Sequence, residues 1–277
     1  MALILDSVSY TYGAGTAFAE RALAGVSLCA AQGEFVLVLG ATGSGKSTLL
    51  RVAAGLLEAD QGVAEIDGVP LTRASARGAV GLVFQDAESQ LFAETVIDDV
   101  AFGPRNLGAS SVEAAQRARL ALAAVGLDPE TFSARSPFGL SGGEARRAAI
   151  AGVLAMDPRY VLLDEPTSGL DARGRAAVRE VLRVARRKTG IVVVSHGAEE
   201  FLGEADRVLV LSQGSTAFAG TGAALVADPG QFGAAGLVAP DVLRFQVLAR
   251  EHGCDVGALT LDPDEAAERV CRGGGWS

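Results

Sequence analysis

Three unbroken apolar runs, each ending at a glycine or polar residue, constrain the fold more than any other feature. Residues 35–39 end at Gly40, residues 160–163 at Asp164 and residues 191–194 at Ser195. Strands without polar alternation are typical of a parallel sheet buried on both faces. Stretches rich in Ala, Leu and Arg, such as 111–125 and 174–187, are typical of helices. The alternation predicts an α/β fold.

Composition and charge exclude several classes of protein. Apolar residues make up 49% of the 277 residues, which excludes wholesale disorder. The 24 basic and 33 acidic side chains give a net charge of −9, which argues against general nucleic-acid binding. Cys29, Cys254 and Cys271 are far apart, so we expect neither a zinc site nor a disulfide framework. Without a long apolar run or a basic N-terminal stretch, we expect a soluble intracellular protein.

The chain divides into regions of different character. Residues 3–12 read as a strand, whereas residues 86–139 contain no comparable apolar strand and read as a mostly helical insert. After residue 211 the sequence becomes rich in Gly and Ala, and residues 240–253 fit one amphipathic helix. We therefore expect a main domain over 1–225 with a helical subdomain at about 86–150, and a C-terminal extension over 226–277.

Residues 40–47 match the phosphate-loop pattern GxxxxGK[ST] at every specified position, and residues 47–50 open a predicted helix. Glycines let backbone N–H groups turn inward around an anion, at the positive end of the following helix. Lys46 would reach the β- and γ-phosphates, and Ser47 would place its hydroxyl on Mg²⁺. A simple Gly-rich turn is the alternative, but the preceding strand favours a nucleotide site formed by Gly40, Ala41, Thr42, Gly43, Ser44, Gly45, Lys46, Ser47 and Thr48.

Two acids follow the second apolar run. Asp164 fits a magnesium partner held through water, and Glu165 fits a base that polarises an attacking water. Pro166 turns the chain away and leaves both carboxylates at the carboxyl edge of the sheet, where open α/β folds bind ligands. Without other motifs, an Asp-Glu pair after a strand more often marks the start of a solvent-exposed loop. After a phosphate loop it is the expected second half of an ATPase.

A further motif resembles the signature of ATP-binding cassette (ABC) ATPases: Leu140, Ser141, Gly142, Gly143 and Glu144. Other marks of that family occur in the family's order: Gln85 after an apolar stretch, residues 168–171 (Ser-Gly-Leu-Asp), and His196 after the third apolar run. The resemblance covers roughly residues 1–220. It implies a RecA-like, mostly parallel P-loop core with an N-terminal antiparallel β subdomain and a helical insert carrying the signature.

The resemblance also implies roles for single residues. Tyr12 resembles the aromatic residue that stacks on adenine, although Tyr10 beside it leaves the choice open. Gln85 resembles the residue that reports the γ-phosphate and Mg²⁺ to a membrane partner, and His196 resembles the histidine that hydrogen-bonds the γ-phosphate. The family commonly has Asp or Asn after that histidine, where this chain has Gly197.

The signature implies that one chain holds only half of each site. Ser141 and the amides of Gly142 and Gly143, at a helix start, suit the γ-phosphate of an ATP held by another copy. Two cassettes would pair head to tail about a two-fold axis, with Asp171 linking the two sites. Glu144 stands where the family often has Gln and adds an acid to the first helical turn.

Residues 81–92, 100–108, 149–156, 239–243 and 250–253 resemble the energy-coupling-factor importers, which bring in vitamins or cobalt and nickel ions. That resemblance implies an ATPase on the cytoplasmic face of the membrane. Its partners would be a second ABC subunit, identical or not, a transmembrane coupling subunit and a substrate-binding membrane subunit. The acids Asp86, Glu88, Asp98 and Asp99 would form a groove for an arginine-bearing coupling helix, or only a solvated acidic face.

Two alternatives remain. The stretches above could be generic cassette sequence, which would indicate another ABC transporter class. A soluble cassette acting on ribosomes or DNA is less favoured, because ribosomal forms usually fuse two cassettes and DNA forms carry long coiled-coil heptads that this chain lacks.

Overall fold

The three apolar runs form neighbouring strands of a six-stranded sheet with the order β10-β9-β3-β8-β7-β6. The computed structural model describes residues 1–273, and for Ala87 and Glu88 it describes the backbone only. All residues of β3, β7 and β8 are buried, and only β10 runs antiparallel to its neighbour. The α/β prediction with a mostly parallel sheet is confirmed. The strands are β3 (Phe35–Gly40), β6 (Val80–Val83), β7 (Tyr160–Asp164), β8 (Gly190–Ser195), β9 (Arg207–Ser212) and β10 (Ser215–Gly220).

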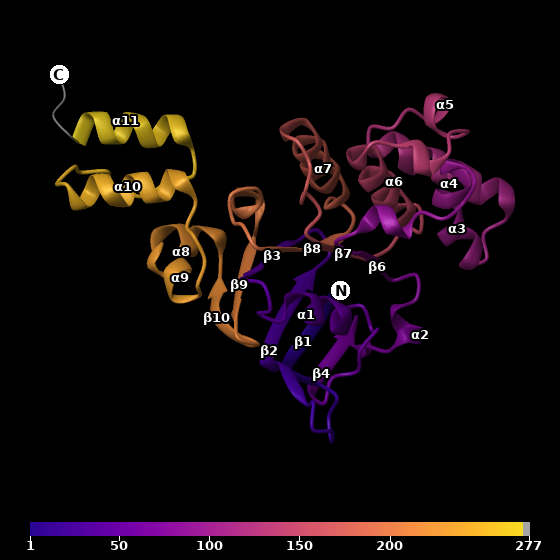
Figure 1. Cartoon of the computed structure of the whole chain (residues 1–277), viewed down its shortest axis with the longest axis horizontal. Coiled ribbons are helices and arrows are strands. Elements are labelled where there is room, and N and C mark those ends of the chain that lie inside the picture. The colour runs from indigo at the N-terminus through magenta and orange to yellow at the C-terminus, as the bar shows by residue number, and fades with distance from the viewer. Residues whose placement is uncertain (274–277) are drawn as a thin grey trace.

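The strands of a second, antiparallel sheet come before and after β3 in the chain. Its order is β2-β1-β4-β5, and it lies below the larger sheet in Figure 1. Strand β1 contains the predicted 3–12 strand, which confirms that prediction. The strands are β1 (Ala2–Tyr12), β2 (Glu20–Ala31), β4 (Gln61–Ile66) and β5 (Val69–Pro70).

Alternate residues of the central strands face two separate hydrophobic cores. On β3, Val36 and Val38 face the core shared with the antiparallel sheet and helix α1 (Lys46–Ala53). Phe35, Leu37 and Leu39 face the opposite core, which includes side chains of helix α7 (Ala172–Ala185) and of the helices between β6 and β7. Side chains alternate along a strand, so an all-apolar run must be covered on both faces.

Between β6 and β7 the chain is helical, as predicted for residues 86–139. These helices lie together beyond β6 in Figure 1. The predicted 174–187 helix, α7, begins two residues earlier, because the Asp171 carboxylate caps it by accepting a hydrogen bond from the Gly174 N–H at 2.7 Å. The α-helices between β6 and β7 are α3 (Val96–Asn106), α4 (Ser111–Ala124), α5 (Pro129–Phe132) and α6 (Gly142–Leu154), whereas the short helix α2 (Arg73–Ala76) precedes β6.

The C-terminal helices lie at the opposite end of the molecule from α3–α6 (Figure 1). The predicted 240–253 helix is α10, and the wholly buried Gln246 joins it to the segment before α11. Its amide nitrogen donates to the Thr260 carbonyl at 2.7 Å and its amide oxygen accepts from the Thr260 N–H at 3.1 Å. These helices are α8 (Gly222–Ala227), α9 (Gly230–Ala234), α10 (Asp241–Glu251) and α11 (Pro263–Gly273).

Cys29, Cys254 and Cys271 are free thiols, so no disulfide joins them. Among residues 1–273, no helix combines the length and the apolar character needed to cross a membrane.

A buried side-chain bond joins the two sheets. The Tyr160 hydroxyl, at the start of β7, donates to the Asp67 carboxylate at 2.7 Å, in the turn between β4 and β5. The Arg159 guanidinium pairs with the other oxygen of the same carboxylate. Burial and the Asp67 carboxylate hold the pKa of Tyr160 well above its ordinary value, so the phenol stays protonated and donates.

Replacing Tyr160 by Phe removes this donor without changing the ring. We expect the free energy of unfolding to fall by about 1–2 kcal/mol, because the Asp67 carboxylate loses a buried hydrogen bond. Urea denaturation measures the change, and Tyr10→Phe, on a half-exposed ring, is the matched control. Equal stability of Tyr160→Phe and wild type would show that this bond does not join the sheets.

Candidate active site

The loop between β3 and α1 requires glycine at defined positions. A Cβ on Gly40 would lie 2.3 Å from Ser44 Oγ and 2.6 Å from the Leu211 carbonyl oxygen. Gly45 has φ +100°, and a Cβ there would lie 2.5 Å from the Ala22 carbonyl oxygen. No other residue fits these two positions without moving backbone. Ala41, Thr42 and Gly43 lie exposed between them.

Lys46 is nearly buried at the start of α1, with 8% of its surface exposed. Its Nζ donates to the carbonyl oxygens of Gly40 at 2.7 Å and Ala41 at 2.9 Å. Burial lowers the pKa of Lys46, while the negative charges of Glu165 and Asp164 act in the opposite direction. The structure therefore brings together the lysine and the two acids that the sequence placed in one site.

Tyr12 lies against the helix that follows the loop. Its hydroxyl is 3.3 Å from Thr48 Oγ1, and the Arg51 guanidinium donates to the same hydroxyl at 3.3 Å. The Tyr10 ring contacts Tyr12 edge to face, with centroids 4.9 Å apart. Ser47 lies partly buried in the first turn of α1. Of the two tyrosines, Tyr12 is the one bonded to α1.

Glu165 and His196 lie side by side at the carboxyl ends of β7 and β8. Glu165 Oε2 is 2.9 Å from His196 Nδ1, with the carboxylate side chain 12% exposed and the imidazole 67% exposed. The Glu165 backbone has φ +49°, and its N–H donates to the Val194 carbonyl at 3.0 Å. His196 is thus oriented by Glu165, although Gly197 follows it.

Arg146 was missed by sequence reasoning. It lies buried on α6, and its guanidinium donates to the Glu165 carbonyl oxygen at 3.0 Å. An arginine in an Ala-rich helix after the signature gave no indication of this contact. Gln85 lies exposed two residues after Val83, which pairs with Leu163 of β7, so it belongs to the same edge of the sheet as Asp164.

Ser141 and Glu144 form a capping box at the start of α6. Ser141 Oγ accepts from the Glu144 N–H at 3.4 Å, and the Glu144 carboxylate accepts from the Ser141 N–H at 2.8 Å and from Ser141 Oγ at 2.8 Å. These hydrogen bonds, first that of the Ser141 backbone, hold the pKa of Glu144 below its ordinary value, and Arg135 and Arg147 add to the effect. Glu144 therefore serves the cap as a carboxylate.

The signature residues lie apart from the other predicted site residues. The hollow containing Ser141, Gly142, Gly143 and Glu144 shares only Gly169 with the hollow containing Glu165 and His196. Asp171 lies beside the signature in the first of these hollows.

The phosphate-binding loop after a buried parallel strand, the acids at the same sheet edge and the capped signature helix define an ATPase of the cassette type. A family model described as ABC transporter matches residues 23–168. The chain belongs to the ABC transporter family.

Similar proteins extend this match over almost the whole chain. The energy-coupling factor transporter ATP-binding protein EcfA2 of Symbiobacterium thermophilum is 44% identical over 276 residues, covering 98% of this chain and 96% of that protein. EcfA2 of Clostridium acetobutylicum is 38% identical, covering 98% of each chain.

Among solved structures, cbiO1 from Clostridium perfringens, part of the ABC transporter complex cbiONQ, superposes with a TM-score of 0.74 at 31% identity. The match covers 88% of this chain and 98% of that one. The dimeric ATP-binding cassette MJ0796 bound to ADP and Pi superposes with a TM-score of 0.71 at 29% identity, covering 80% and 98%.

Proposed function

We propose that this chain is the ATP-hydrolysing subunit of an energy-coupling-factor importer. The observation that carries the proposal is the glycine-shaped loop that holds the buried Lys46 ammonium on the Gly40 and Ala41 carbonyls, at the sheet edge where β7 ends in Asp164. A buried cation beside a glycine-shaped loop is suited to the β- and γ-phosphates of a nucleotide. Relatives named EcfA2 that match nearly the full length support the importer class.

In this proposal residues 40–48 hold the triphosphate and Tyr12 stacks on adenine. Backbone N–H groups at the start of α1 face the phosphates, and Lys46 neutralises their charge. The bonds from Thr48 and Arg51 to the Tyr12 hydroxyl support this role, because they hold the ring beside the loop.

Magnesium binding is supported by the chemistry of the donor set. Ser47, Gln85 and Asp164 offer a hydroxyl, an amide and a carboxylate oxygen, the hard ligands that Mg²⁺ takes together with substrate phosphates. We expect the ion to bind together with the nucleotide, whose phosphates would supply further ligands, and to offset phosphate charge there.

Glu165 would act as the base that polarises the attacking water, with His196 beside it to hydrogen-bond the γ-phosphate. The 2.9 Å contact between their side chains supports a shared task. The 12% exposure of the Glu165 side chain keeps the carboxylate in a sheltered position while leaving an edge open to water.

A second cassette would complete each site. Ser141, Gly142 and Gly143 form a separate anion-suited helix start, with Glu144 fixing the cap, and they lie away from Lys46 of the same chain. In a head-to-tail pair these groups would contact the γ-phosphate of an ATP held by the partner, which gives two sites per dimer. The dimeric form of the MJ0796 cassette supports this arrangement.

Replacing Glu165 by Gln keeps size and hydrogen bonding but removes the basic carboxylate. We expect turnover to fall by at least about 10²-fold, because the water is no longer polarised. ATP binding should persist, so ATP-bound dimer should accumulate in size-exclusion chromatography with ATP and Mg²⁺. Lys46→Ala is the control, since it should lose binding itself. Near-normal hydrolysis by Glu165→Gln would remove Glu165 as the base.

The sequence predicts an acidic groove for the membrane partner, and the structure shows what its carboxylates contact. The carboxylate of Asp98 pairs with Arg105 at 3.0 Å, and that of Asp99 accepts from the Phe92 and Ala93 N–H groups at 2.7 and 2.8 Å. Both carboxylates therefore have local partners, and the side chain of Asp98 is 47% exposed. The side chain of Glu88 lies outside what the structure describes.

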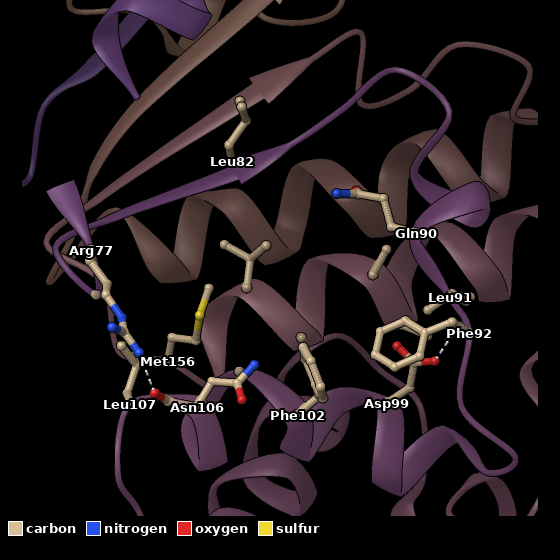
Figure 2. Close-up of a pocket in the computed structure, with 16 residues that line it drawn as sticks. Arg77, Leu82, Gln90, Leu91, Phe92, Asp99, Phe102, Asn106, Leu107 and Met156 are labelled. Carbon is tan, nitrogen blue, oxygen red and sulfur yellow. Dashed lines mark hydrogen bonds between the residues drawn. The ribbon is translucent and has the colours of Figure 1, made fainter. Parts of the chain in front are cut away.

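Figure 2 shows the hollow that remains beside these residues. It is lined mostly by apolar side chains, including Leu82, Phe92, Phe102, Leu107 and Met156, with Arg77 at one end and Asp99 at the other. A coupling helix seated here would present an apolar face, with a cation only where it approaches Asp99.

In the proposed assembly this chain is peripheral, on the cytoplasmic face of the membrane, and its partners are a transmembrane coupling subunit and a substrate-binding membrane subunit. Its substrate would be a vitamin or a cobalt or nickel ion. The alternative is the ATPase of another ABC transporter class, or a soluble cassette. Affinity purification of the tagged chain from solubilised membranes should recover both membrane subunits, whereas recovery of ribosomes or DNA alone would contradict the importer.

A further inference from the structure

A second bridge joins the two loops that carry Glu165 and His196. The Thr167 hydroxyl, two residues after Glu165, donates to the carboxylate of Glu200, four residues after His196. Thr167 is 7% exposed, so its hydroxyl is a buried polar group that this carboxylate satisfies.

Glu200 also reaches the segment that contains Asp171. Its other oxygen lies 3.0 Å from Arg175 Nε, and the same guanidinium donates to the Leu170 carbonyl oxygen at 2.9 Å. One carboxylate therefore connects the end of the β7 loop, the residue before Asp171 and the loop after β8. Thr167, Arg175 and Glu200 line the same hollow as Glu165 and His196.

A neighbouring ion pair provides an internal comparison. Glu204 lies four residues after Glu200, and Arg179 lies four residues after Arg175. Glu204 and Arg179 pair at 2.7 Å, so this pair also joins the segment after β8 to α7. The carboxylates are similarly exposed, 29% for Glu200 and 21% for Glu204. Glu200 alone of the two also bonds to Thr167. Partly exposed ion pairs contribute little to folding, so both should matter little for stability.

We propose that Glu200 is a positioning residue for ATP hydrolysis, which sets the β7 and β8 loops so that Glu165 and His196 face the same γ-phosphate. The inference rests on the roles proposed above for those two residues. The same carboxylate also holds Leu170, because Arg175 binds both groups. In this way it sets the position at which Asp171 would meet the second cassette.

Misplacing reacting groups by a small distance lowers turnover without removing substrate contacts. Glu200→Ala should therefore lower kcat by about 10- to 100-fold, with the ATP dissociation constant within about two-fold of wild type. Thr167→Val should lower kcat in the same direction, and adding it to Glu200→Ala should cause little further loss. Glu204→Ala, the matched control, should leave kcat unchanged.

The test measures kcat, ATP affinity and the urea midpoint of each variant in the same purified assembly as wild type. A loss of kcat in Glu200→Ala that exceeds the control, at equal affinity and stability, supports the positioning role. A kcat equal to that of Glu204→Ala overturns it, as does a loss explained by weaker ATP binding or unfolding. Normal hydrolysis by Glu165→Gln would overturn the role proposed for Glu165, and absence of ATP hydrolysis by the wild-type assembly would overturn the proposed function, so these failures are distinguishable from that of the positioning role.

Discussion

The buried ammonium of Lys46 imposes the strongest physical constraint on this molecule. Removing a charge from water is costly unless oxygen atoms replace the lost water. The carbonyls of Gly40 and Ala41 accept two hydrogen bonds, and Asp164 and Glu165 supply opposite charge. These oxygens come from the ends of β3 and β7, which are separated in the sheet only by β8, so the parallel strand order is what assembles the site.

The same sheet edge explains why the proposed chemistry is divided between copies. Strands β7 and β8 deliver Glu165 and His196 to one hollow, while α6 delivers Ser141 to another. The two hollows meet only at Gly169, in the segment that leads to Asp171. Residues 167–171 therefore connect Glu165 and His196, the groups proposed to act in hydrolysis, with the surface that a second cassette would meet. Glu200 is important because its carboxylate holds both ends of this connection, through Thr167 and Arg175.

Local sequence pattern was sufficient to predict the strands with unbroken apolar runs and the loop with strictly spaced glycines. The apolar runs form β3, β7 and β8, and the glycine-rich residues 40–45 form the loop that leads into α1 at Lys46. Contacts between distant side chains could not be predicted in this way. Tyr160 with Asp67, Arg146 with Glu165, and Thr167 with Glu200 each join residues far apart in the chain, and no spacing rule reports them. The acidic groove stays a prediction, and its carboxylates have local partners that charge counting does not include: Arg105 for Asp98 and the Ala93 N–H for Asp99.

The central claim is that Ser141 of one cassette completes the site at Lys46 of another, and Ser141→Arg tests it most directly. The measurement pairs ATP affinity of the isolated chain with turnover of the assembled ATPase. Ser110→Arg removes the equivalent cap of α4 and is the matched control for helix stability. The account predicts that Ser141→Arg keeps the affinity of wild type within about two-fold and loses turnover, because the cation occupies the γ-phosphate position of the partner's site. Normal turnover, or loss of affinity in the isolated chain, would contradict it.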